Sequence, residues 1–138
     1  MGLFSGKRPS GLGMKGGKLK VCSWKPNCVN STADAAADAA HYADPLKFSG
    51  PAPKAWAAAL TIIKTAPRVN IVTENATYLY CEYRSKSMGY VDDVELSLDA
   101  AAGLIHVRSA SRLGVRDFGV NRARIEALRD RLTAALAK

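Results

Sequence analysis

The sequence lacks the features that would place it at once among membrane, secreted or multidomain proteins. Its 138 residues contain no run approaching the ~20 consecutive apolar residues that a membrane-spanning helix needs. The first twenty residues have no apolar segment of the kind found in secretory signals, so we expect a cytoplasmic protein without a transmembrane segment. The same stretch contains no Asp or Glu, and the whole chain has a net charge of +8, which favours anionic partners.

Motifs for several catalytic chemistries are also missing. No Gly-x-Ser-x-Gly sequence is present, so the turn that exposes a nucleophilic serine in many hydrolases is not expected. The glycines between residues 11 and 17 lack the flanking strand and helix of a phosphate-binding loop. Asp92 and Asp93 are adjacent, and neighbours on a strand point to opposite faces, so they do not form a catalytic pair.

The sequence has only three cysteines and two histidines, which are too few for a convincing metal site. A structural zinc ion takes four ligands, and only Cys22, Cys28 and His41 lie near one another in the sequence. We therefore expect no metal and no other cofactor. Cys22 and Cys28 are either free thiols, as in a cytosolic protein, or a disulfide, as in an oxidising compartment. Cys81 has the position of a small core residue on the apolar face of a strand.

Composition divides the chain into two parts. Residues 1–20 are rich in glycine and in positive charge, which is typical of a flexible basic arm. Residues 21–138 have the size and composition of a single α+β domain with one core. This domain starts with an irregular cysteine-containing segment over residues 21–32, because Pro26 and Asn27 form a turn signal.

The periodicity of the remaining residues predicts two helices and four strands. Trp56, Leu60 and Ile63 recur at helical spacing, and Asn121 is the expected N-cap of the last helix. Short connections between the strands imply hairpins, so the four strands form an antiparallel meander sheet. Since each helix has one apolar face, both helices should pack on one face of the sheet. The expected elements are a helix over 51–66, strands over 68–73, 77–85, 90–98 and 104–111, and a helix over 121–137.

Alternation along the strands assigns their side chains to two faces of the sheet. The inner face carries Val69, Ile71, Leu79, Cys81, Tyr83, Val94, Leu96, Leu98, Ile105 and Val107. The outer face carries Tyr78, Tyr80, Glu82, Arg84, Asp93, Glu95, His106 and Arg108. In this register Glu95 lies opposite Arg108, and Asp92 lies on the inner face opposite Ser111. An unpaired buried carboxylate is costly, so Asp92 needs a cationic partner. The expected partner is Arg112, Arg122 or Arg124.

The most unusual segment is RSASRLGVRDFGVNRAR, residues 108–124, which has five arginines, one carboxylate and two glycines. Guanidinium groups held close together suit either the binding of oxyanions or a network of structural ion pairs. In the structural interpretation, sheet carboxylates pair with the arginines and order the loop. In the functional interpretation, the arginines, nearby serines and the start of the last helix form an anion pocket. The candidate ligand-binding residues are Arg84, Asp92, Arg108, Ser109, Ser111, Arg112, Asp117, Asn121 and Arg122.

These residues support three classes of function. The first is a non-catalytic binding or accessory domain with an arginine-rich site for an anionic small molecule or an acidic protein surface. The second is an enzyme that uses Asp92 with the arginine cluster. The third is a nucleic-acid-binding module, in which Tyr78, Tyr80 and Trp24 would stack on bases. The third is disfavoured, because Glu82, Asp93 and Glu95 would make the sheet face repel phosphate.

Five short motifs stand in a distinctive order along the chain. They are CS at 22–23 with PNCV at 26–29, H at 41 with PLKF at 45–48, YVDDVE at 90–95, IHVRSASR at 105–112, and DFGVNR at 117–122. In these motifs the sequence resembles domain-of-unknown-function family 1499 of bacteria and plastids. The resemblance implies one domain over about residues 21–136 and supplies no reaction. Relatives often begin with a signal, lipoprotein or membrane segment, so the resemblance implies an envelope location as the alternative to the cytoplasm.

Overall fold

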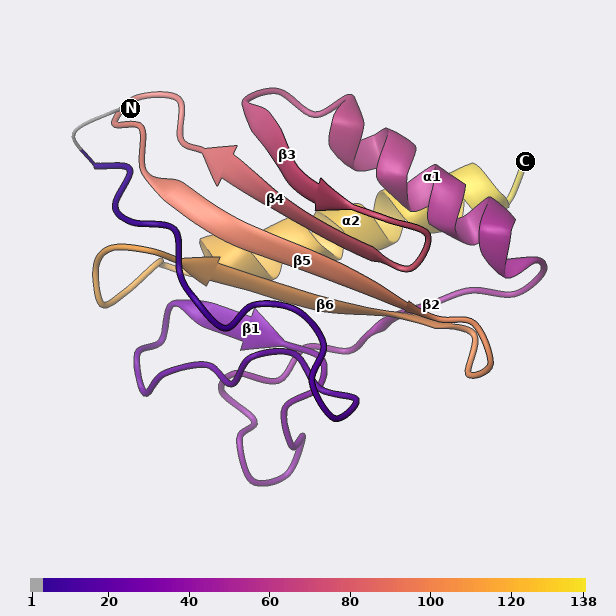
Figure 1. Ribbon diagram of the computed structural model, residues 1–138, viewed down its shortest axis with the longest axis horizontal. Helices are drawn as coiled ribbons and strands as arrows, with labels where there is room; N and C mark the ends of the chain where they lie inside the picture. Colours follow the sequence, from indigo (N-terminus) through magenta and orange to yellow (C-terminus); the bar gives the residue numbers. More distant parts are fainter. Residues whose placement is uncertain (1–3) are drawn as a thin grey trace.

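A computed structural model describes residues 4–138 and shows an antiparallel sheet with two helices on one side (Figure 1). The α+β class expected from the sequence is confirmed. None of the helices within the described range is long and apolar enough to cross a membrane. The elements are β1 (Cys28–Asn30), β2 (Leu46–Lys47), α1 (Ala52–Lys64), β3 (Val69–Glu74), β4 (Tyr78–Arg84), β5 (Val91–Asp99), β6 (Leu104–Ser111) and α2 (Val120–Leu136).

The predicted meander is present as β3, β4, β5 and β6, each paired antiparallel with the next. The register is also as predicted, because Glu95 pairs with Arg108 and Asp92 pairs with Ser111 across β5 and β6. The sheet is larger than the four strands expected, since β1 and β2 both pair antiparallel with β6. Strands of three and two residues are too short to produce an alternating pattern, so the sequence indicated only irregular chain there.

The core lies between the inner face of the sheet and the two helices. All ten strand residues assigned to the inner face belong to the main apolar cluster, as buried members or packed against it. On α1 the buried stripe includes Trp56, Ala59 and Ile63, and on α2 it includes Ile125 and Leu132. The apolar face of the sheet and the apolar stripes of the two helices thus form one layer, which explains why the helices lie on this side of the sheet.

Part of the outer face of the sheet is covered by the N-terminal segment. In the view of Figure 1, this indigo segment passes in front of β6 and then of β1, and it leaves β3 and most of β4 uncovered. Arg8 pairs with Glu82 at 3.0 Å, and the backbone N–H of Gly13 donates to Glu95 at 2.7 Å. Leu19 is buried, and its N–H donates to Thr32. The sequence predicts a flexible arm over 1–20; the structure places residues 4–20 against the sheet, and residues 1–3 lie outside the described residues.

Candidate functional site

The candidate residues from the sequence divide between the two faces of β6, so they do not all belong to one site. Because side chains alternate along a strand, Arg108 and Arg112 project to the outer face, whereas Ser109 and Ser111 project toward α2. Two candidates lie apart from both groups. Arg84 is exposed at the end of β4 and donates to the carbonyl of Gly89. Arg122 donates to the carbonyl of Ala40 and borders a smaller pocket of about 190 Å³.

Asn121 is the centre of the inner polar group. It is fully buried, and its side-chain N–H groups donate to Ser111 Oγ at 2.9 Å, to Asp117 Oδ2 at 2.8 Å and to the carbonyl of Asn27. Its Oδ1 accepts from Ser109 Oγ at 2.6 Å. The prediction that Asn121 is an N-cap is therefore wrong. The helix starts at Val120 after Gly119, and Asn121 lies within the first turn, facing β6.

Asp117, and not Asn121, caps the start of α2. Its carboxylate accepts the backbone N–H groups of Gly119 and Asn121, at 2.9 and 3.0 Å. Burial alone would raise the pKa of Asp117, but the hydrogen bonds from Asn121 and Gly119 lower it overall. Asp117 thus caps the first turn of α2, and within residues 4–138 its carboxylate forms no ion pair with an arginine.

Asp92 has the cationic partner that its inner position requires. Arg124, one of the three expected partners, forms an ion pair with Asp92 at 2.8 Å. The same guanidinium lies 4.6 Å from the centre of the Tyr83 ring and also donates to Ser109 Oγ. Asp92 is consequently held in a structural contact between β5 and α2.

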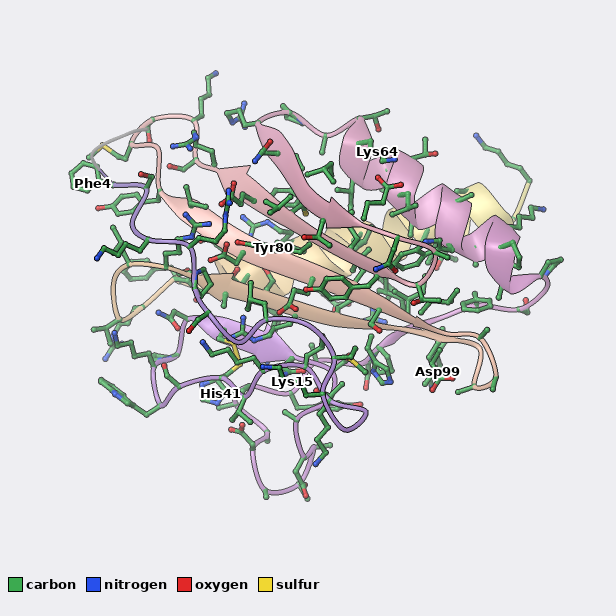
Figure 2. The ribbon with its side chains drawn as sticks, viewed as in Figure 1. Phe4, Lys15, His41, Lys64, Tyr80 and Asp99 are labelled. Carbon is green, nitrogen blue, oxygen red and sulfur yellow. A yellow bond between two sulfur atoms is a disulfide. The ribbon has the colours of Figure 1, made fainter. Side chains whose placement is uncertain are left out.

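The outer face carries a second network, centred on Arg112. Its Nε donates to Asp93 Oδ2 at 2.9 Å, and its Nη2 pairs with Glu82. Tyr80 lies in the middle of the sheet (Figure 2), and its hydroxyl group donates to Asp93 Oδ1 at 2.5 Å. The side chains of Arg112 and Asp93 are only 4% and 3% exposed. Burial alone would raise the pKa of Glu82, but hydrogen bonds from Arg8, Asn70 and Arg112 lower it to about 2.

A separate group of contacts on the same face surrounds Glu95, which is fully buried beneath the N-terminal segment. Tyr78 donates to its Oε2 at 2.5 Å, and Arg108 Nη1 lies 3.9 Å from its Oε1. Burial, followed by the contact with Glu95, raises the pKa of Tyr78, so the phenol keeps its proton and acts as a donor. Burial also lowers the pKa of Arg108, although the nearby carboxylates oppose that shift.

A pocket of about 280 Å³ opens beside the contacts of Arg112 and Glu95, between the N-terminal segment, residues 20–28 and β6. Its lining carries five cations and one carboxylate, so its electrostatic character is positive. These charged residues are Lys7, Lys20, Lys25, Arg108, Arg112 and Asp93. Arg112 and Asp93 are already paired with each other, whereas the side chains of Lys7 and Lys25 make no hydrogen bond or ion pair with any residue of 4–138.

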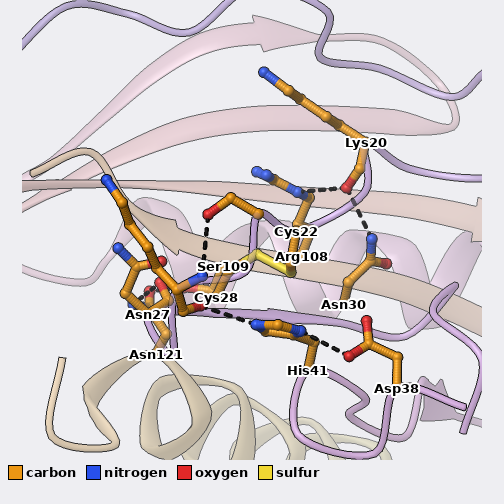
Figure 3. Close-up of a disulfide and its surroundings, with 12 residues drawn as sticks. Lys20, Cys22, Asn27, Cys28, Asn30, Asp38, His41, Arg108, Ser109 and Asn121 are labelled. Atoms are coloured by element: carbon orange, nitrogen blue, oxygen red, sulfur yellow. Dashed lines mark hydrogen bonds and ion pairs between the residues drawn. A yellow bond between two sulfur atoms is a disulfide. The ribbon is translucent and has the colours of Figure 1, made fainter. Parts of the chain in front are cut away.

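A disulfide between Cys22 and Cys28 closes the loop that forms one wall of this pocket (Figure 3). This bond resolves the alternatives for the two cysteines. His41 supports the same loop, because its Nε2 contacts the carbonyl of Lys25 at 2.9 Å and its Nδ1 contacts Asp38 at 2.8 Å. Burial lowers the pKa of His41, but these two contacts outweigh it and raise the pKa overall. Within residues 4–138 no three His, Cys, Asp or Glu side chains are grouped to hold a metal ion.

Sequence reasoning found Arg108, Ser111 and Arg112 of this pocket but missed its lysines. Lys7, Lys20 and Lys25 stand in segments whose composition predicts irregular chain, and no local pattern assigns such residues to a strand face. The only available signal was charge. The acid-free N-terminal segment and the carboxylates of the outer sheet face have opposite signs, which indicates that the two should meet.

Comparison with known proteins identifies a family and no activity. No curated protein matches the chain. A family model described as "Protein of unknown function (DUF1499)" matches residues 18–132. This match covers β1 to β6, the pocket walls after Lys18 and most of α2. The chain therefore belongs to the DUF1499 family.

Proposed function

We propose that this protein is a non-catalytic binding or accessory domain that holds an anion in the positive pocket beside β6. The observation that carries the proposal is the excess of cations over carboxylates in the pocket lining. Lys7 and Lys25 contribute most to this excess, because structural partners do not neutralise them. Ammonium groups around a concave surface bind phosphate or carboxylate oxygens through charge-assisted hydrogen bonds.

The size of the pocket limits the ligand. A volume of about 280 Å³ suits a phosphorylated or carboxylated small molecule. An acidic side chain on a protein surface offers the same chemistry and is the alternative source of the anion. Both sources would contact Lys7, Lys25 and Arg108, so the residues of the site do not depend on the choice.

The two other classes of function have less support. An enzyme based on Asp92 would need that carboxylate in the pocket, but Asp92 faces α2 in an ion pair with Arg124. A nucleic-acid module would need free aromatic faces on the sheet. Tyr80 is buried and Tyr78 is half-buried, and each donates its hydroxyl to a carboxylate under the N-terminal segment. Both arrangements favour binding of a small anion over these alternatives.

Calorimetric titration with pyrophosphate and citrate at low ionic strength tests the proposal. We expect wild type to bind at least one of them, and Lys7→Ala/Lys25→Ala to raise its Kd at least about tenfold, since hydrogen bonds to charged groups contribute about 1.5–3 kcal/mol each. The control is Lys47→Ala/Lys54→Ala, which removes the same charge from exposed positions outside the pocket. Equal weakening in both variants, or no binding by wild type, would contradict the proposal.

The disulfide also bears on location. Disulfides persist in oxidising compartments and are rare in the reducing cytoplasm. We infer that the envelope alternative is favoured over the cytoplasmic location expected from the N-terminal sequence. Alkylating the thiols in fresh cell extracts, before and after reduction, measures this directly. Protection of Cys22 and Cys28 until reduction supports the inference, and immediate alkylation of both would support the cytoplasm.

A further inference from the structure

One end of the sheet carries exposed apolar side chains that serve neither the core nor the positive pocket. Three loops lie at this end: residues 85–90 between β4 and β5, residues 112–119 between β6 and α2, and the disulfide loop 22–28. We call this surface the docking end. Figure 2 places Phe4 at this end and Asp99 at the opposite one. The exposed apolar residues of the three loops and of the adjoining start of α2 are Trp24, Met88, Tyr90, Leu113, Val115, Phe118 and Val120.

Contacts join two of the loops of the docking end to each other and tie them to the strand that follows the third. Asn27 Nδ2 donates to the carbonyl of Gly114 at 2.8 Å, which joins the disulfide loop to the loop before α2. The N–H of Arg112 donates to the carbonyl of Val91, which joins that loop to the start of β5. Phe4 and Tyr90 stack with their ring centres 4.9 Å apart.

The most exposed aromatic side chain at this end stands on a strained backbone. Phe118 has a φ of 56°, in the left-handed region that a bulky residue occupies only at a cost in free energy. Its side chain is nevertheless 92% exposed, so no packing in the domain compensates for that cost. Trp24, held out by the disulfide loop, is 76% exposed. Two large aromatic rings are therefore presented to solvent from separate loops.

The charge of the docking end is positive. The three loops and the end of β4 carry Arg84, Lys86, Arg116 and Lys25, together with Arg112, whose charge is neutralised by Asp93 and Glu82. Their one carboxylate, Asp117, accepts hydrogen bonds from Gly119 and Asn121 with both oxygens. The unpaired charge around Trp24 and Phe118 is thus cationic.

We propose that the docking end binds an anionic lipid bilayer. Trp24 and Phe118 enter the interface between headgroups and acyl chains, where aromatic rings are favoured. Arg116 and Lys86 lie at the level of the headgroup phosphates and are attracted by the negative surface potential. A fluid bilayer accepts aromatic rings from separate loops with cations between them, whereas a protein partner would need a matching hollow for each ring. This proposal does not rest on the anion pocket, since neither Phe118 nor Arg116 lines it.

The chain provides its own reporter for the test. It has two tryptophans, and Trp56 is 6% exposed in the core, so a change in emission on adding vesicles reports mainly on Trp24. The whole protein is titrated with vesicles of phosphatidylcholine alone and of phosphatidylcholine mixed with phosphatidylglycerol. We expect a blue shift and co-sedimentation with the mixed vesicles, both weakened by salt.

Two variants separate the apolar and the electrostatic contributions. Phe118→Asn removes the ring, and asparagine tolerates the left-handed backbone, so partitioning should fall at least about tenfold without loss of folding. Arg116→Ser/Lys86→Ser should reduce the preference for phosphatidylglycerol and leave binding of pyrophosphate in the pocket unchanged. The matched controls are Met14→Ser and Lys47→Ala/Lys54→Ala, which alter exposed residues away from this end.

Three results would overturn the proposal. The first is the absence of a blue shift with mixed vesicles, and the second is equal vesicle binding by wild type and Phe118→Asn. The third is self-association in sedimentation that Phe118→Asn abolishes, in a protein that does not bind vesicles. That last result would assign the docking end to contact between two copies of the chain.

Discussion

Replacing Arg112 by alanine should lower the free energy of unfolding by about 3–5 kcal/mol, because it removes the cation from a buried ion-pair network. The side chains of Arg112 and Asp93 are almost fully buried, and Glu82 has lost most of its contact with water. Without the guanidinium, Asp93 would keep only the hydrogen bond from Tyr80 among the contacts described above. Urea denaturation at pH 7 measures the difference. The matched control is Arg116→Ala, an exposed arginine in the following loop, which should change stability by less than about 0.5 kcal/mol.

The dependence of this effect on pH gives a second check. The pKa of Glu82 is lowered to about 2 from a usual value of 4.5, so its contribution to stability is present above pH 4.5 and is lost as the pH falls toward 2. The deficit of Arg112→Ala should therefore shrink across that acid range. A deficit that stays constant down to pH 2, or one no larger than that of Arg116→Ala, would show that the network does not stabilise the fold as described.

This prediction also limits how Arg112 can be used to study binding. Arg112 lines the pocket, but its guanidinium already contacts Asp93, Glu82 and other acceptors. Loss of ligand binding in Arg112→Ala would confound a damaged fold with a damaged site. Lys7 and Lys25 are the appropriate positions, since their side chains have no structural partner within residues 4–138.

Replacing Asn121 by leucine should lower the free energy of unfolding by at least about 3 kcal/mol, since each buried polar group left without a partner costs about 1–3 kcal/mol. The change keeps the number of side-chain heavy atoms but removes the donors to Ser111, Asp117 and the carbonyl of Asn27. These contacts tie the start of α2 to β6 and to the segment before β1. Hydrogen exchange should therefore show earlier loss of protection in the first turns of α2.

Asn70→Leu on β3 is the matched control for Asn121→Leu. Asn70 is exposed, and its amide makes one side-chain hydrogen bond, to Glu82. We expect a loss below about 1 kcal/mol for this variant. Similar losses in the two asparagine variants would mean that the buried position of Asn121 has no special importance for stability.

Local periodicity predicted much of the fold because it reports directly on which side of an element is buried. Alternation in β5 and β6 was sufficient to pair Glu95 with Arg108 and to place Asp92 opposite Ser111. A one-residue slip would have exchanged the apolar and polar faces of a strand, so the register was strongly constrained. The need of a buried carboxylate for a cation then predicted that Asp92 pairs with Arg112, Arg122 or Arg124, and the partner in the structure is Arg124.

The candidate site was predicted less well, because proximity in sequence is a poor guide to proximity on a sheet. The segment 108–124 appeared to be one cluster, yet alternation sends Arg108 and Arg112 to one face and Ser109 and Ser111 to the other. Asn121 was expected at the helix start because its residue type is common there. Its burial against β6 became visible only with the helix in place.

The sequence by itself determined the fold class, the two faces of the sheet and the strand register, since short-range patterns of apolar residues specify each of them. Only the tertiary structure decided that residues 4–20 lie against part of the outer face, that Cys22 and Cys28 form a disulfide, and that Lys7 and Lys25 meet Arg108 around one pocket. These segments contain no repeating pattern of their own. Their positions depend on long-range contacts with a sheet that forms from other parts of the chain, and local sequence does not encode those contacts.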